Sequence, residues 1–165
     1  RILKADCNNE FHGHPNSGNF CLPMGGIAPF LEGKVTCLDI NKDKVEKTRL
    51  LYPELDIQIG SVTQIPFDNQ TFDVVLDLST LDHIEFSEGE KAISEYRRVL
   101  KTAGTLILAV WCGNEDLGHQ TFYYLREKII KWLKKSFVIN YEIELMEEVN
   151  HHLILWQCIK HVGTP

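Results

Sequence analysis

The chain has 165 residues, 44% of them hydrophobic and 24% charged, and 23 acidic against 17 basic residues give a formal charge of −6. This length suits one globular domain over 1–165, and no linker-like stretch divides it. The acidic balance disfavours general binding to nucleic-acid backbones, which requires a basic surface. No apolar run approaches the roughly 20 residues of a membrane-spanning helix, so we expect no membrane association.

The cysteines favour a reducing, cytoplasmic compartment, because they are odd in number, widely spaced and without a C-x-x-C pair. The densest group of metal-binding residue types is Cys7, His12, His14 and Cys21. Its spacing matches no usual zinc motif, so no metal site is predicted. No signal peptide is visible, and we expect sequence to precede Arg1, since the chain does not begin with Met.

Residues 1–18 are polar and show no period, so they are expected to be an irregular N-terminal segment. From Val35 onward the chain alternates strand and helix patterns. In chain order we predict a strand at 35–39, a helix from Asn41 to Pro53, strands at 55–60 and 71–79, a helix at 86–104, a strand at 105–111, a helix at 119–135, and strands at 136–145 and 152–160.

Four signals set the boundaries of the first two helices in this prediction. Asn41 is a candidate N-cap for the first helix, and Pro53 stops it. Ser87 and Glu90 have the spacing of a capping box for the second helix, and Gly104 closes it.

The order of elements predicts an α/β fold. Alternating strands and helices favour a mostly parallel sheet with helices on both faces. The last two strands are joined by a connection so short that they must pair antiparallel. We therefore expect a three-layer α/β/α sandwich whose seven-strand sheet ends in an antiparallel hairpin.

Ligands of open α/β sheets lie beyond the carboxyl ends of the strands, so the residues that follow each strand are the candidates. Asp39 is the strongest candidate, because a carboxylate at the end of a strand can accept hydrogen bonds from both hydroxyls of a ribose. A helix cap or a solvent-exposed acid in a turn is an equally simple interpretation of Asp39.

Several motifs resemble the class I S-adenosylmethionine-dependent methyltransferases, in particular the small-molecule branch. The quoted segments are "VTCLDI", "IGSVTQIPFDNQTFDVVLDLSTLDHI" and "EYRRVLKTAGTLILAV". The usual sequence pattern of the family has an acid at the end of a strand, then G-D-A-x-x-L-P-F-x-D-x-x-F-D-x-V, then R-V-L-K-P-G-G. The resemblance runs from about Gly25 to Lys160 and implies S-adenosylmethionine as cofactor.

The resemblance also implies roles for particular residues. Asp39 would hold the ribose hydroxyls, with Ile40 beside the adenine. Ser61 and Val62 stand where the family has Asp-Ala next to the adenine amino group. Asp77, Leu78 and Ser79 would line the methionine end of the cofactor. Gly25 and Gly26 would belong to the glycine-rich loop.

The sequence departs from the family at two places. Ser61 replaces an acid, so a hydroxyl or backbone groups would recognise the adenine. The motif D-x-G-x-G-x-G falls on Asn19, Cys21, Pro23 and Gly25 in one register and one residue later in the other. Either register keeps a single glycine, and Pro23 prevents a loop of ordinary shape.

Asp82 and His83 follow the fourth strand of the family pattern, where a methyl acceptor would sit. They are the candidate catalytic residues, with His83 able to accept a proton from the acceptor. A surface dipeptide that caps the next segment is the simpler interpretation of this pair.

The leading hypothesis is an S-adenosylmethionine-dependent methyltransferase that acts on a small molecule. A methyltransferase-like domain with impaired cofactor binding, acting as a partner or scaffold, is the alternative. A nicotinamide-dependent oxidoreductase would share Asp39 but not the terminal hairpin. The segment from Cys112 to Gly118 is short, so we expect either an open site or one closed by residues outside this sequence or by the second subunit of a homo-oligomer.

Overall fold

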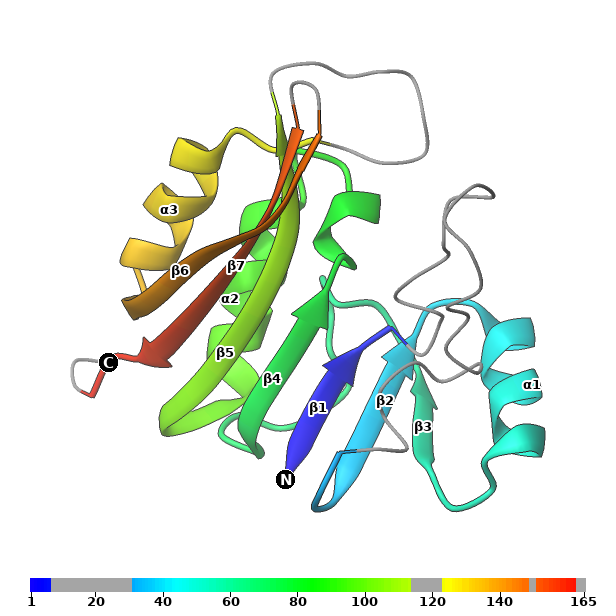
Figure 1. The fold of residues 1–165 in the computed structure, drawn as a ribbon. Helices are drawn as coiled ribbons and strands as arrows, with labels where there is room; N and C mark the ends of the chain where they lie inside the picture. The colour runs from blue at the N-terminus through cyan, green and yellow to red at the C-terminus, as the bar shows by residue number, and fades with distance from the viewer. Residues whose placement is uncertain (7–30, 114–122, 149–150, 163–165) are drawn as a thin grey trace.

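The structure is a computed structural model and describes residues 1–6, 31–113, 123–148 and 151–162 (Figure 1). Among the described residues, no helix is long and apolar enough to cross a membrane. The elements in chain order are β1 (Ile2–Ala5), β2 (Val35–Asp39), α1 (Lys42–Leu51), β3 (Asp56–Ile59), β4 (Phe72–Leu78), the 3-10 helix η2 (Leu81–His83), α2 (Gly89–Val99), β5 (Leu100–Gly113), α3 (Arg126–Lys134), β6 (Phe137–Glu148) and β7 (His151–Lys160).

The strands form one seven-stranded sheet in the order β3-β2-β1-β4-β5-β7-β6. The pairs from β3 to β5 are parallel, and β7 pairs antiparallel with both β5 and β6. The predicted mixed sheet with its terminal antiparallel hairpin is therefore confirmed. The strand order reverses between β1 and β4, and this reversal is the point at which open α/β sheets hold their ligands.

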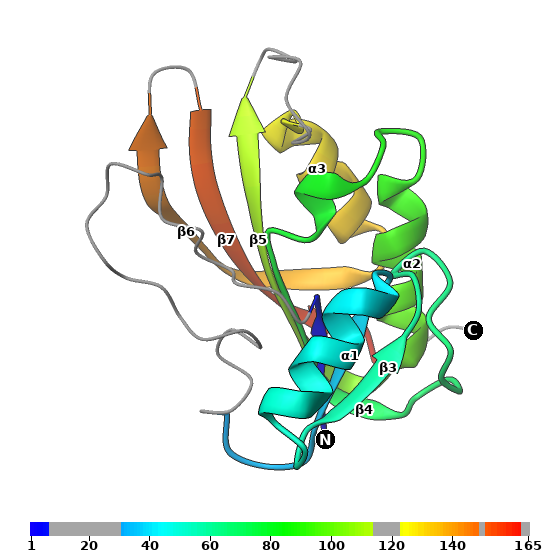
Figure 2. The same ribbon diagram turned by 90° about the vertical axis from the view of Figure 1, so that its right-hand side faces the viewer.

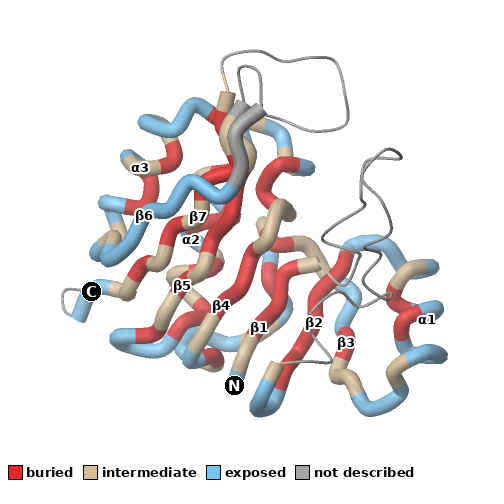
Figure 3. The backbone as a smooth tube through the Cα atoms, in the orientation of Figure 1, coloured by how far each residue is buried: buried red, intermediate tan, exposed pale blue. Residues whose placement is uncertain are grey.

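Alternate side chains of the strands point into two separate cores. Val35 and Cys37 of β2 pack with Val45 of α1, whereas Leu38 joins the larger core that includes residues of α2 and α3. Helix α1 thus covers one face of the sheet and α2 and α3 cover the other, which gives the three layers (Figure 2). Buried positions run along the central strands, while β6 at the edge is mostly exposed (Figure 3).

The prediction that residues 1–18 are irregular is wrong for Ile2–Ala5, which form β1 at the centre of the sheet. The strand has only four residues, and Lys4 interrupts its apolar pattern although it is completely buried. Its ammonium group donates a hydrogen bond to the backbone carbonyl of Asp6. A buried lysine needs such hydrogen-bond partners. No local sequence pattern indicates that they are present, so the strand could not be predicted.

The first helix follows its prediction, and the other two are shorter than expected. The side chain of Asn41 caps α1 by accepting a hydrogen bond from the Lys44 N–H (3.1 Å). Helix α2 ends at Val99 because Leu100 already begins β5, so Gly104 does not close it, and its N-cap is Glu88 rather than Ser87.

Helix α3 begins at Arg126, and the expected start at His119 lies outside the described residues. Tyr124 instead forms a β-bridge with Cys112. The Tyr124 side chain is completely buried, and its hydroxyl donates to the backbone carbonyl of Ile84 (2.8 Å). The backbone at Tyr124 is extended, and this conformation places the ring in the core. The tertiary contact outweighs the local helical pattern of the sequence, so the helix begins only after Tyr124.

Candidate active site

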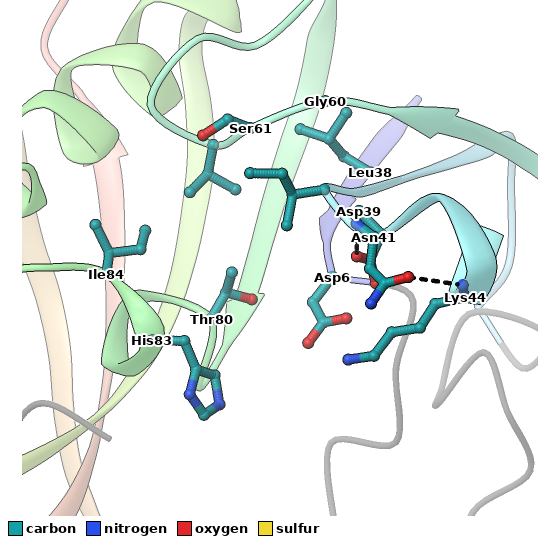
Figure 4. Close-up of a pocket in the computed structure, with 12 residues that line it drawn as sticks. Asp6, Leu38, Asp39, Asn41, Lys44, Gly60, Ser61, Thr80, His83 and Ile84 are labelled. Atoms are coloured by element: carbon teal, nitrogen blue, oxygen red, sulfur yellow. Dashed lines mark hydrogen bonds between the residues drawn. The ribbon is translucent and has the colours of Figure 1, made fainter. Parts of the chain in front are cut away.

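A pocket of about 290 Å³ opens at the carboxyl ends of β1, β2 and β3 and beside the turn after β4 (Figure 4). It therefore lies beside the reversal of strand order, as the fold requires. Its lining residues are Asp6, Leu38, Asp39, Ile40, Asn41, Lys44, Gly60, Ser61, Val62, Thr80, His83 and Ile84.

Five residues singled out in the sequence meet in this pocket: Asp39, Ile40, Ser61, Val62 and His83. Three different connections deliver them, after β2, β3 and β4. Parallel strands place their carboxyl ends at one edge of the sheet, and this is why residues so far apart in sequence come together. Their convergence is the arrangement that a nucleoside-binding site requires.

Asp39 ends β2 with its side chain largely buried, and its Oδ1 accepts a hydrogen bond from the Asn41 backbone N–H (2.7 Å). Burial raises the pKa of Asp39 and the neighbouring Asp6 raises it further, whereas the hydrogen bond from Asn41 and the charge of Lys44 oppose the shift. The next residue, Ile40, is 74% exposed and offers an apolar surface at the pocket. The carboxyl group of Asp39 can bind a sugar hydroxyl. The exposed aliphatic side chain of Ile40 can pack against a planar base.

The turn after β3 forms the opposite wall of the pocket. Gly60 passes so close to β2 that a Cβ on it would lie 2.8 Å from the Leu38 Cδ1. The Ser61 hydroxyl accepts a hydrogen bond from the Thr63 N–H (3.1 Å) and shares another with the Thr63 hydroxyl (2.8 Å). Ser61 therefore stabilises its own turn and presents a hydroxyl that is already hydrogen-bonded.

Asp82 and His83 are neighbours in sequence but face different surroundings in η2. His83 lines the pocket. Asp82 is not among the lining residues; it is almost completely buried, and its Oδ1 accepts from the Trp111 backbone N–H (3.0 Å). The geometry favours His83 over Asp82 as the residue that meets an acceptor, and the catalytic role of either stays a prediction.

Asp77 is buried behind the pocket, and both of its carboxylate oxygens are used by the protein. Its Oδ2 accepts from the Tyr96 hydroxyl (2.7 Å) and its Oδ1 from the Thr80 backbone N–H (2.8 Å). Burial raises the pKa of Asp77 to about 6. The Thr80 hydroxyl donates in turn to the carbonyl of Ala5 (3.2 Å), so Asp77 links α2 to the end of β1.

Leu78 and Ser79 are half-buried and are not among the residues that line the pocket. Ser79 has a left-handed backbone with φ of 64°, and its N–H donates to the carbonyl of Ala109 (2.9 Å). This conformation turns the chain from β4 into η2. Contact of Asp77, Leu78 or Ser79 with a cofactor stays a prediction.

The remaining lining residues were not singled out as ligand contacts in the sequence. Asp6 was missed because β1 was missed, whereas Thr80 falls among the residues from Asp77 to His83 that follow a predicted strand and were expected near the site. Lys44 belongs to the first turns of α1 and has no motif of its own. Its place three residues after the N-cap Asn41, in the first turn of the helix that follows β2, is the signal that could have found it.

The loop after the first strand begins at Asp6, not within residues 19–26, so both registers considered for the glycine motif started it too late. Gly25 and Gly26 lie outside the described residues. When D-x-G-x-G-x-G is placed at the end of β1, its acid falls on Lys4 and its first glycine on Asp6. Asp6 keeps the backbone conformation of a glycine, with φ of 67°.

Comparison with known proteins agrees with this fold. A family model described as a methyltransferase domain matches residues 16–108. The demethylmenaquinone methyltransferase of Renibacterium salmoninarum is 28% identical over 102 residues, which are 62% of this chain and 40% of that protein. The chain spans 25–44% of the length of the curated relatives it matches.

Two solved structures illustrate the likeness in fold. An S-adenosylmethionine-dependent methyltransferase from Methanosarcina mazei has a TM-score of 0.73 and 16% identity, covering 98% of this chain and 92% of that chain. A protein from Pyrococcus horikoshii has a TM-score of 0.75 and 17% identity, covering 97% and 81% respectively. The mixed sheet and the pocket at its carboxyl edge define a class I methyltransferase fold. The chain belongs to the methyltransferase domain family.

Proposed function

We propose that the protein is an S-adenosylmethionine-dependent methyltransferase that acts on a small-molecule acceptor. The observation that carries this proposal is the convergence of Asp39, Ile40 and the turn at Gly60 and Ser61 on one pocket at the carboxyl edge of the sheet. Membership of the methyltransferase domain family supports it independently.

The described residues fit the adenosine part of this cofactor. Asp39 supplies a carboxyl group held in place by the Asn41 N–H, and the hydroxyls of a ribose are the partners it suits. Ile40 and Val62 supply apolar contacts for the adenine, beside the hydroxyl of Ser61. The methionine part would meet the loop that begins at Asp6.

Bound S-adenosylmethionine would supply a methyl group on a positively charged sulfur, which nucleophiles attack. The protein would contribute mainly proximity and alignment, since methyl transfer needs little covalent assistance. His83 lies in the pocket wall and would accept a proton from an acceptor that must lose one. Asp82 would act only through the position of the backbone at Trp111, with which it shares a hydrogen bond.

Isothermal titration with S-adenosylmethionine and S-adenosylhomocysteine tests the proposal. We expect saturable binding to the wild-type chain, weakened at least about tenfold in Asp39→Ala, because the hydroxyl contacts of a charged group contribute about 1.5–3 kcal/mol. Asp43→Ala removes an exposed acid from the first turn of α1 and serves as the matched control. Absence of both heat and thermal shift at millimolar ligand would favour the scaffold alternative.

A further inference from the structure

Asp6 places a second carboxyl group beside Asp39 in the same pocket. Strands β1 and β2 are parallel, with Ala5 opposite Leu38. Asp6 follows Ala5 at the end of β1 and Asp39 follows Leu38 in β2, so the two acids come directly after a pair of residues on chains about 5 Å apart. Both line the pocket, and Figure 4 shows both side chains there.

The local backbone fixes the position of the Asp6 side chain. The φ angle of 67° is unusual for a residue with a Cβ, although aspartate tolerates it better than most. The Lys4 ammonium group donates to the Asp6 carbonyl, and the Thr80 hydroxyl donates to the Ala5 carbonyl (3.2 Å). A residue of β1 itself and one from the turn after β4 thus hold this turn, and a glycine here would keep the turn but remove the carboxyl group.

The two carboxyl groups form an acidic pair with a limited countercharge. The neighbouring Asp6 carboxyl raises the pKa of Asp39, in addition to the effect of burial. The other charged or titratable groups at the pocket are Lys44 from α1 and His83 from η2, and Lys4 approaches from β1. Two neighbouring carboxylates can accept hydrogen bonds from both hydroxyls of a ribose.

We propose that Asp6 is the charge-selecting residue of this pocket: with Asp39 it admits nucleoside ligands that are neutral or cationic and excludes those that carry a phosphate on the ribose. The inference rests on the proposed function, because it takes the pocket to be the adenosyl site. Asp39 supplies the hydroxyl contacts, and Asp6 adds a negative charge that the glycine of the family motif would not supply. A phosphate dianion would meet this charge in a partly enclosed space, where like charges repel more strongly than in water.

Binding of adenosine and adenosine 5′-monophosphate, measured by isothermal titration at pH 7.5, tests the proposal. We expect the wild-type chain to bind adenosine more than about tenfold tighter than the monophosphate, a difference of about 1.4 kcal/mol. In Asp6→Asn, which keeps the size of the side chain and tolerates the left-handed backbone, this preference should fall about tenfold. Asp43→Asn removes the same charge from an exposed site outside the pocket and should change the preference less than twofold.

Asp6→Gly provides a second variant with the residue of the family motif, and thermal unfolding confirms that each variant is folded. S-Adenosylmethionine is titrated into every protein in parallel. If the wild-type chain binds S-adenosylmethionine but Asp6→Asn and Asp6→Gly keep the wild-type preference for adenosine over its monophosphate, the role of Asp6 is overturned and the proposed function stands. If the wild-type chain binds no adenosyl ligand, both are overturned.

Discussion

Asp82 is a buried carboxyl group with only half of its hydrogen-bonding capacity used. Its Oδ1 accepts from the Trp111 N–H, whereas its Oδ2 has no hydrogen-bond partner. Burial raises the pKa of Asp82 well above the ordinary value, and the nearby charge of Asp77 raises it further. The folded protein therefore holds the Asp82 proton more tightly than the unfolded chain does.

This preference makes stability depend on pH in a defined direction. Because the folded chain holds the Asp82 proton more tightly than the unfolded chain, stability falls as pH rises above about 4. Asp82→Asn keeps an acceptor for Trp111 but cannot ionise. Urea unfolding at pH 5 and pH 8 should show that the variant loses less stability between these values than the wild type, by at least about 1.4 kcal/mol, the free energy of one pKa unit.

Asp77 is the other buried acid in this region, and its pKa of about 6 leaves part of the pH dependence in the variant. Glu88→Gln, at an exposed carboxylate before α2, is the control and should follow the wild-type profile. Equal losses of stability in Asp82→Asn and the wild type would show that Asp82 does not titrate on unfolding.

At the scale of elements, two glycines allow close approaches with different consequences. Gly60 joins β3 to the pocket wall, where an added Cβ would meet Leu38 at 2.8 Å and Pro66 at 2.9 Å. Gly89 starts α2, where an added Cβ would meet the Tyr124 hydroxyl at 2.7 Å and the Trp132 ring at 2.9 Å. The first contact lies at the site and the second lies between elements of the core.

Gly60→Ala and Gly89→Ala therefore form a matched pair. Each should lower the free energy of unfolding by about 1–3 kcal/mol, the usual penalty for overpacking. Only Gly60→Ala should weaken the binding of S-adenosylmethionine, because only it displaces Leu38 and the turn that carries Ser61. Chemical unfolding and isothermal titration measure the two effects. A loss of affinity in Gly89→Ala equal to that in Gly60→Ala would contradict this separation.

At the scale of the whole molecule, most strands could be predicted because they are continuous apolar runs between clear turn signals. Asn41 and Pro53 bounded α1 for the same local reasons. Strand β1 could not be predicted in this way, since its burial depends on long-range partners on both sides and on the hydrogen bond of Lys4. The error then affected the site, because the glycine motif was placed from residue 19 or 20 onward, about fifteen residues after its position at the end of β1.

The central place of β1 leads to the last prediction. Ile2–Ala5 pair with β2 on one side and β4 on the other, so this short strand joins the two parts of the sheet. Leu3 is completely buried in the larger core. Leu3→Ala should therefore lower the free energy of unfolding by about 2–5 kcal/mol, the usual range for a buried leucine.

Ile143 lies on β6 at the edge of the sheet and is 51% exposed, so Ile143→Ala is the control and should cost less than about 1 kcal/mol. Urea unfolding followed by circular dichroism compares the two variants under the same conditions. Losses of similar size would mean that β1 is a dispensable strand and that the two parts of the sheet cohere without it. A large loss of unfolding free energy in Leu3→Ala alone would mean that β1 stabilises the part of the sheet that carries Asp6 and Asp39, since β1 ends at the pocket.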